Sequence, residues 1–140
     1  MKDVTLKHRL PGRAEIDQLI AFLPHLYAPG FIPVKSWGGG AQEGVLTMPW
    51  PIYDDLVLGF MDLAGAPCWC DYRYRPEKAA AMLRDPLVVS KANLAEVRTM
   101  LTYCVRGERF CDGHWAAMIE DGHVRRLLER LEELVRLGLV

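Results

Sequence analysis

Apolar residues recur every three or four positions along much of the chain, a spacing that predicts amphipathic helices. The pattern is strongest near the end, where mostly charged residues fill the positions between Val124, Leu127, Leu128, Leu131, Leu134 and Val135. The same spacing predicts helices over 14–23, 52–64, 76–84, 94–106 and 112–120. The best strand candidates are Val45–Met48 and the segment 69–74, which could pair as a small accessory β-ribbon. The sequence therefore predicts a mainly α protein, a single compact domain of about five to seven helices over residues 1–140.

Residues that favour helix ends mark several of these boundaries. Pro76 can occupy the first position of a helix, where its missing amide hydrogen is not needed. Asn93 followed by Glu96 has the spacing of a capping box. The tripeptide Asp-Gly-His occurs at 112–114 and at 121–123, and we expect each Asp to cap the helix that follows it. The alternative is one divalent metal ion shared by both tripeptides. It is disfavoured because their spacing places them on opposite sides of a continuous helix.

The segment 28–51 is rich in glycine and proline and includes the run Gly38-Gly39-Gly40. Apart from the short strand candidate within it, this composition predicts a long connection without regular structure. Long ordered connections of this kind are often lids or binding loops.

Composition and charge exclude some classes of protein. The 140 residues are 51% hydrophobic and 25% charged, which fits a globular domain that buries a core without disulfide support. The formal net charge of −1 gives no general attraction to nucleic acids or anionic membranes. The segment 1–13 has no apolar run of signal-peptide length, and no stretch approaches the ~20 apolar residues that span a membrane. We therefore expect a cytoplasmic protein without a membrane partner, with Cys68, Cys70, Cys104 and Cys111 reduced.

The segment RGERFCDGHW, residues 106–115, resembles the motif of an uncharacterised bacterial family known as a domain of unknown function. The resemblance runs from about Tyr53 through CDYRYRPEKAAAML and YCVRGERFCDGHWAAMIEDGHVRRLLERL, and ends near Leu131. It implies a small, soluble, mostly helical bacterial protein. Because the family has no established activity, the resemblance implies no reaction and no catalytic residues.

Charged residues gather where the helix over 94–106 meets the helix over 112–120. Two arginines three positions apart, Arg106 and Arg109, could hold a carboxylate or phosphate through their planar, forked donors. Amides at the start of the second helix could add further donors, although Asp112 would repel an anion there. The predicted ligand-binding residues are Arg73, Arg106, Glu108, Arg109, Asp112, His114 and Trp115. A competing interpretation is an internal salt-bridge network that joins Arg106 and Arg109 to Glu108 and Asp112.

Two further interpretations involve cysteine chemistry. Cys104, Cys111 and His114 could supply three ligands to zinc, with Cys68 or Cys70 as the fourth, although the spacing is not the paired pattern of established zinc sites. Alternatively, Cys111 could be a nucleophile activated by His114, with neighbouring arginines favouring the thiolate.

Taken together, these patterns favour a small-ligand-binding or protein-interaction module over an enzyme and predict no cofactor. The expected partner is a small anionic ligand or another protein. A homodimer through the C-terminal helix is a further option, because an apolar stripe on a helix can form an interface. Nucleic acid is disfavoured, because the chain is slightly acidic and the second helix of the 94–120 pair carries mixed charge.

Overall fold

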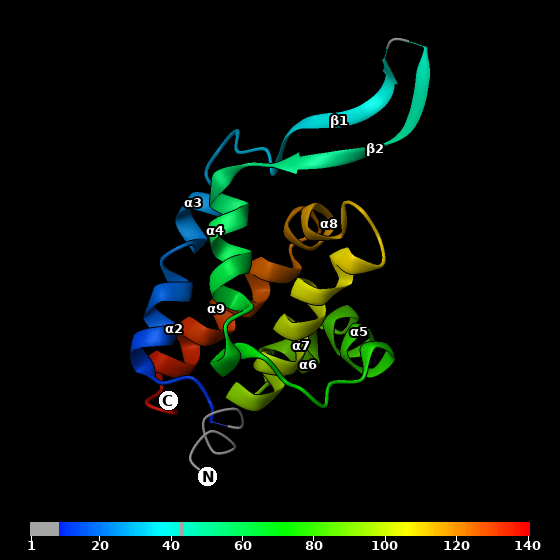
Figure 1. Ribbon diagram of the computed structural model, residues 1–140. Coiled ribbons are helices and arrows are strands. Elements are labelled where there is room, and N and C mark those ends of the chain that lie inside the picture. Colours follow the sequence, from blue (N-terminus) through cyan, green and yellow to red (C-terminus); the bar gives the residue numbers. More distant parts are fainter. Residues whose placement is uncertain (1–8, 43) are drawn as a thin grey trace.

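The computed structural model describes residues 9–42 and 44–140, and it confirms a mainly α fold with one small antiparallel sheet (Figure 1). Part of the segment 1–13, on which the signal-peptide expectation rests, lies outside these residues. The α-helices are α2 Arg13–Ile20, α3 Leu23–Leu26, α4 Asp55–Ala64, α5 Pro76–Arg84, α6 Pro86–Ser90, α7 Leu94–Arg106, α8 His114–Glu120 and α9 His123–Arg136. Two short 3-10 helices, η1 Pro67–Trp69 and η2 Gly107–Arg109, follow α4 and α7. The strands are β1 Val34–Gln42 and β2 Val45–Tyr53.

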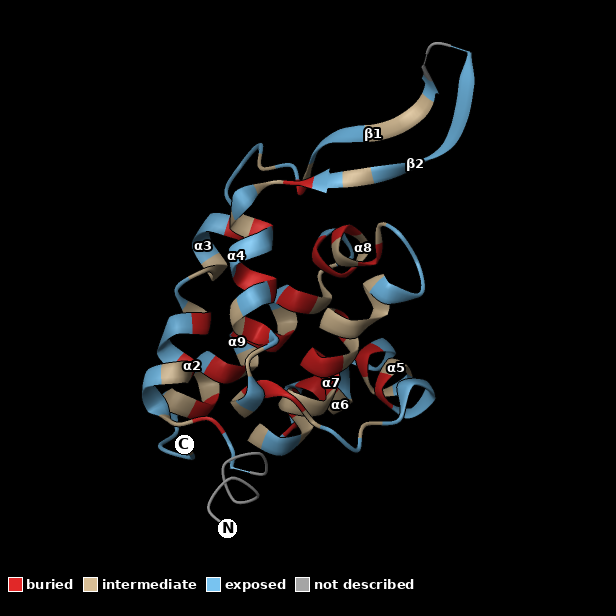
Figure 2. Cartoon of the chain, in the orientation of Figure 1, coloured by how far each residue is buried: buried red, intermediate tan, exposed pale blue. Residues whose placement is uncertain are grey.

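The C-terminal helix α9 lies at the centre of the helical body, where it packs against α7, α2, α6 and α8. Its predicted apolar face is buried in the core, with Val124, Leu127, Leu128, Leu131 and Leu134 all at 2% exposure or less. Figure 2 shows the buried positions turned inward along the helices. A homodimer through α9 would therefore have to use its other, charged faces. Within the described residues, no helix is both long enough and apolar enough to cross a membrane.

Local end signals account for several helix boundaries. Asn93 and Glu96 form the predicted capping box at the start of α7, with hydrogen bonds of 2.8 and 2.9 Å. Pro76 is the first residue of α5, as predicted. The helix predicted over 52–64 instead begins at Asp55, because Asp54 accepts a hydrogen bond from the amide of Leu56 and caps it.

The prediction that Asp112 and Asp121 cap the following helices is wrong. The N-cap positions of α8 and α9 are Gly113 and Gly122, and neither helix has a side-chain cap of its own. Both glycines have left-handed backbone conformations, with φ of 90° and 83°, which glycine adopts without strain. Each Asp therefore lies one residue before the N-cap, so the predicted cap positions are one residue too early.

The prediction of an irregular connection over 28–51 is also wrong for most of that segment. Residues 34–42 and 44–53 form a two-stranded hairpin, called the arm below, which extends away from the helical body in Figure 1. Val45–Met48 is a strand as predicted, but its partner is β1 and not the segment 69–74, which contains part of η1 and a turn. The glycine run has a packing reason: a side chain at Gly38 or Gly39 would overlap the indole of Trp50. Gly38 and Gly39 are therefore the surface on which Trp50 lies.

Candidate functional site

Glu108 is the hydrogen-bonding centre of the junction between α7 and α8. Its Oε1 accepts from the hydroxyl of Tyr53 and from the amide of Trp115, both over 2.8 Å. Its Oε2 accepts from the amide of Gly113 over 3.0 Å. Glu108 therefore satisfies amides at the start of α8 from a different element and ties them to the base of the arm. It takes the capping role that the sequence analysis assigned to Asp112.

The first turn of α8 is held against the end of α7 by two side chains. The Nε1 of Trp115 donates to the carbonyl oxygen of Val105 over 2.8 Å, and its ring lies 5.2 Å from that of Tyr53. The Nε2 of His114 lies 3.2 Å from the carbonyl oxygen of Tyr103, and the two rings meet edge to face. Because a carbonyl can only accept, this bond requires the His114 proton to be on Nε2. Burial lowers the pKa of His114, although Tyr103 and the charge of Glu108 oppose that shift.

Two glycines explain part of the RGERFCDGHW pattern. A side chain at Gly107 would overlap the imidazole of His114, so glycine is needed for the close approach of the two helices. Gly113 has the positive φ that directs the chain into α8. Much of the motif thus consists of residues that the packing of α8 against the end of α7 requires.

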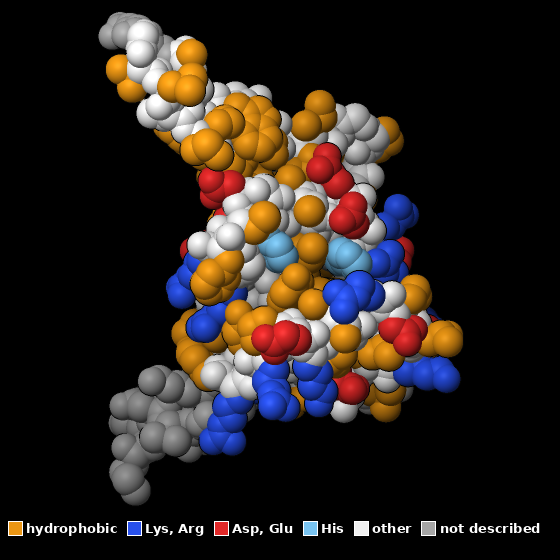
Figure 3. All heavy atoms as spheres, turned by 90° about the vertical axis from the view of Figure 1, so that its right-hand side faces the viewer, with side chains coloured by type: hydrophobic (Ala, Val, Ile, Leu, Met, Phe, Trp, Pro, Cys, Tyr) orange, Lys and Arg blue, Asp and Glu red, His pale blue; other side chains and the backbone are white. Residues whose placement is uncertain are grey.

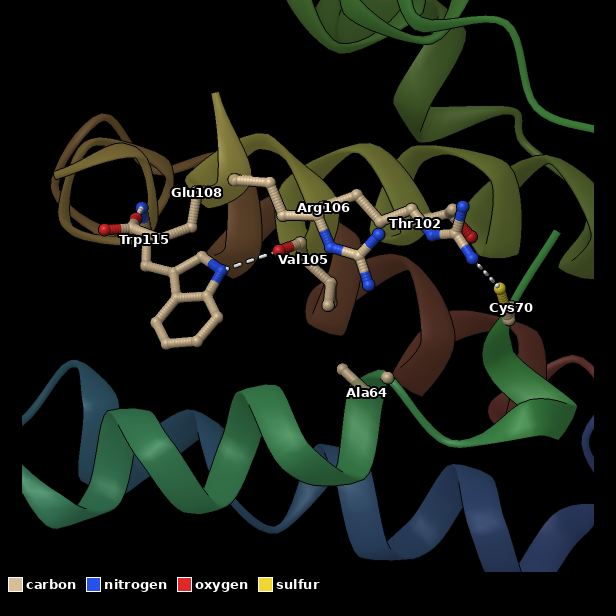
Figure 4. A pocket seen from close by; sticks show the side chains of 9 residues that line it. Ala64, Cys70, Thr102, Val105, Arg106, Glu108 and Trp115 are labelled. Carbon is tan, nitrogen blue, oxygen red and sulfur yellow. Dashed lines mark hydrogen bonds between the residues drawn. The ribbon is translucent and has the colours of Figure 1, made fainter. Parts of the chain in front are cut away.

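A pocket of about 410 Å³ opens between the end of α4 and the end of α7 (Figure 4). Trp115 and Glu108 lie at one end of it and Cys70 at the other, with Val105 and Ala64 between them. The lining residues are Ala64, Gly65, Cys70, Thr102, Val105, Arg106, Glu108, Arg109 and Trp115.

The pocket holds two guanidinium groups and one carboxylate, and they are not paired with one another. Among the described residues, neither Arg106 nor Arg109 makes an ion pair. The salt-bridge network considered for this junction is therefore not formed in this part of the chain. The Nη2 of Arg106 donates to the Sγ of Cys70 over 3.4 Å, and its guanidinium lies 5.8 Å from the ring centre of Tyr74. Since Glu108 is already bound to three donors, both arginines keep donors that a ligand could use.

The structure brings together some of the predicted ligand-binding residues and separates others. Arg106, Glu108, Arg109 and Trp115 line one pocket. His114 is buried beside Tyr103 and does not line it, and Asp112 is exposed outside it. The segment 71–75 does fold back toward α7, but it brings Tyr74 to Arg106 and leaves Arg73 exposed.

Half of the pocket wall comes from earlier in the chain, and these residues were not among the ligand-binding residues predicted from the sequence. Ala64 and Gly65 end α4, and Cys70 follows η1, so packing of distant segments places them opposite α7. The amide of Asp71 donates to the Thr102 hydroxyl over 2.9 Å, which fixes this wall to α7. The feature of the sequence that could have indicated these positions is the extent of the family resemblance, which begins near Tyr53 and includes them.

The cysteine interpretations find no geometric support in the described residues. Cys104 is fully buried in the core, where burial raises the pKa of its thiol to about 12, whereas Cys111 is exposed. The imidazole of His114 is engaged with Tyr103, and among the described residues it forms no hydrogen bond with the thiol of Cys111. Nor do three His, Cys, Asp or Glu side chains gather in a metal-binding arrangement within residues 9–42 and 44–140.

The fold and the pocket define a small helical protein with an arginine-lined cavity at a helix junction. The chain belongs to DUF6508, a family of unknown function, whose family model matches residues 12–137. The match extends the resemblance recognised from the 106–115 motif to nearly the whole chain. No curated protein and no solved structure matches the chain.

Proposed function

We propose that this protein is a binding module for a small organic anion, a molecule with one acidic group and an apolar body. The observation that carries the proposal is the pairing of the charged side chains in the pocket between α4, α7 and α8. Its two arginines have no carboxylate partner among the described residues, while its one carboxylate, Glu108, is fully engaged with Tyr53 and α8.

The acidic group of the ligand would bind Arg106 and Arg109. A guanidinium offers a planar fork of donors that matches a carboxylate or a phosphate, and such charge-assisted hydrogen bonds are the stronger ones. The contacts of Arg106 with Cys70 and Tyr74 hold its side chain along the pocket, which lowers the entropy lost on binding. Amides at the start of α8 do not contribute, contrary to the sequence-based expectation, because those of Gly113 and Trp115 bind Glu108.

The apolar body of the ligand would lie against the side chains of Ala64, Val105 and Trp115. The indole of Trp115 is fixed by its hydrogen bond to Val105 and by contact with Tyr53, so it forms a rigid wall. The volume of about 410 Å³ falls in the range of roughly 300–1,000 Å³ that small-molecule sites occupy. An inorganic anion alone would leave this wall unused and should bind more weakly than an anion with a hydrocarbon part.

We assign the protein to the cytoplasm as part of the same proposal. Cys68, Cys70, Cys104 and Cys111 are all free thiols, and one of them lies in the pocket wall beside Arg106. Thiols persist in reducing compartments, where the exposed Cys111 would also stay reduced.

Thermal melts of the whole chain with inorganic phosphate, hexanoate and benzoate test the proposal. We expect hexanoate or benzoate to raise the melting temperature more than phosphate does, because ligands that bind only the folded state stabilise it. Arg106→Gln and Arg109→Gln should remove that increase. Arg73→Gln is the matched control, because it changes the same charge at an exposed position outside the pocket.

Three results would count against this function. The first is a wild-type protein that none of the three anions stabilises and that retains no small molecule in native mass spectrometry. The second is an Arg73→Gln variant that loses the response as fully as the two pocket variants. The third is a loss of several degrees in both pocket variants without ligand, which would show that the arginines brace the fold.

A further inference from the structure

We propose that the arm, residues 34–42 and 44–53, is the surface through which two copies of this chain associate. The arm contributes little to the core of its own chain: β1 and β2 contact each other far more than either contacts a helix. It nevertheless carries large apolar side chains in contact with solvent. They are Trp37, Val45, Leu46, Met48, Trp50 and Ile52, with Leu46 and Met48 each 84% exposed.

The apolar side chains lie on both sides of the arm. Trp50 and Ile52 are opposite Gly38 and Ser36 on one face, and Trp37 is on the other face. The register shift between Gly38 and Gly40 interrupts this alternation before Met48 and Leu46, which continue the apolar surface toward the tip. The indole of Trp50 lies across Gly38 and Gly39, which extends this surface over β1. Figure 3 shows hydrophobic side chains gathered on the arm, with the charged groups of that view lying below it. Sheets normally bury such a face against another layer, and an isolated two-stranded hairpin is only marginally stable.

The charge of the arm favours a second copy over a charged partner. Among its described residues, Lys35 is the only charged one, so the arm offers no pattern of charge to complement an acidic or basic surface. Two identical uncharged faces can meet about a twofold axis without like-charge repulsion. Pairing along the outer edge of β2 is disfavoured, because Pro49 and Pro51 have no amide hydrogen to donate. The contact we propose is therefore between faces and not between strand edges.

The available area is sufficient for a stable dimer. Each exposed apolar side chain of the arm offers on the order of 100 Å² of surface, judged against the ~150–250 Å² that a fully buried aromatic residue contributes. The six lie on both sides of the arm and together offer about 600 Å² per partner, the lower end of the ~1,200–2,000 Å² in total that stable interfaces bury, so the second copy must cover both sides. In a single copy this apolar surface is exposed to water, and its burial in a dimer would be favourable.

Sedimentation velocity of the full chain over a dilution series tests the proposal. We expect the wild-type protein to sediment as a dimer at micromolar concentrations and to dissociate on dilution. The double variant Leu46→Lys/Met48→Lys should halve the weight-average mass and leave the far-ultraviolet circular dichroism spectrum unchanged, because both side chains are almost fully exposed. Leu87→Lys is the control: Leu87 is an exposed apolar residue of α6, away from the arm, and its substitution should leave the dimer intact.

Three outcomes would overturn the proposal. A wild-type protein that stays monomeric at every concentration shows that the arm does not join two copies. A dimer that persists in the double variant places the interface elsewhere on the molecule. A monomer that binds phosphatidylcholine vesicles, and loses that binding in the double variant, shows that the arm contacts a lipid surface instead.

Discussion

The phenolic hydroxyl of Tyr53 donates a hydrogen bond of 2.8 Å to Oε1 of Glu108, and this bond joins the base of the arm to the pocket. Tyr53 is the last residue of β2 and is buried, and Glu108 is in the 3-10 helix η2. Burial, together with the bond to Glu108, raises the pKa of Tyr53, so the hydroxyl remains protonated and able to donate through the neutral pH range. The position of the arm thus depends on the residue that also holds the start of α8.

The first prediction concerns Tyr53→Phe, which removes this hydroxyl and keeps the ring that contacts Trp115. We expect the free energy of unfolding to fall by about 1.5–3 kcal/mol, the range for a hydrogen bond to a charged acceptor. Urea denaturation followed by circular dichroism measures the change. Tyr72→Phe, at an exposed position, is the control and should have no effect. Equal denaturation midpoints in the wild type and Tyr53→Phe would show that the bond does not stabilise the fold.

The second prediction concerns Glu108→Ala, which removes the acceptor for three donors at once. The amides of Gly113 and Trp115 and the hydroxyl of Tyr53 lose their partner, and we expect a loss on the order of 3 kcal/mol. Tyr53→Phe added to Glu108→Ala should cost little more, because the shared bond is already absent. Glu120→Ala at an exposed position of α8 is the control. Full additivity of the two substitutions would contradict the shared hydrogen bond.

The long helices were predictable from the sequence because their information is local. The stripe of α9 repeats over almost four turns, and all its central positions are buried as the spacing predicted. The capping box at Asn93 was equally readable, since both of its hydrogen bonds lie within four residues of chain. Such patterns depend little on the rest of the molecule.

The arm and half of the pocket were not predictable in the same way. The alternation of Leu46, Met48 and Trp50 is a strand signal, but Pro49 and Pro51 argue against a strand, and the three glycines of β1 give no signal at all. These glycines lie in a strand because β1 pairs with β2, and Gly38 and Gly39 pack against Trp50, which lies more than ten residues away in sequence. At the pocket, Cys70 meets Arg106 through the packing of η1 on α7. Arg73 was predicted to reach the site, but the turn brings its neighbour Tyr74 to Arg106 instead. A difference of one residue in a turn thus changes which side chain reaches the site.

The third prediction concerns Gly107→Ala, which should destabilise the protein by about 1–3 kcal/mol as an overpacked contact. The new methyl group would overlap the imidazole of His114 and force the start of α8 away from α7. Combining it with His114→Ala removes the overlap, so the double variant should be more stable than the sum of the two single losses predicts. Gly59→Ala in α4 is the control, because a side chain there meets only ordinary contacts with Phe22. A strictly additive double variant would show that the two residues do not meet.

The fourth prediction concerns the dependence of stability on pH. Burial lowers the pKa of both His114 and His123 below the ordinary value of 6.5, and the charge of Arg126 lowers that of His123 further. The Nη2 of Arg126 donates to Nδ1 of His123 over 2.9 Å, a bond that requires an unprotonated nitrogen. Below pH 6.5 the unfolded chain therefore binds more protons at these positions than the folded chain does. The stability they provide is fully present above pH 6.5 and is lost as the pH falls through the lowered folded values.

Urea denaturation at a series of pH values between about 7.5 and 5.5 tests this expectation in the range where histidine titrates. The free energy of unfolding of the wild type should be nearly constant above neutral pH and should decrease toward the acidic end. In His123→Gln the decrease should be shallower, because one of the two histidines with a lowered pKa is gone. His25→Gln, at an exposed position, should retain the wild-type slope. If the protein instead becomes more stable on acidification through this range, the buried, neutral state assigned to His114 and His123 is incorrect.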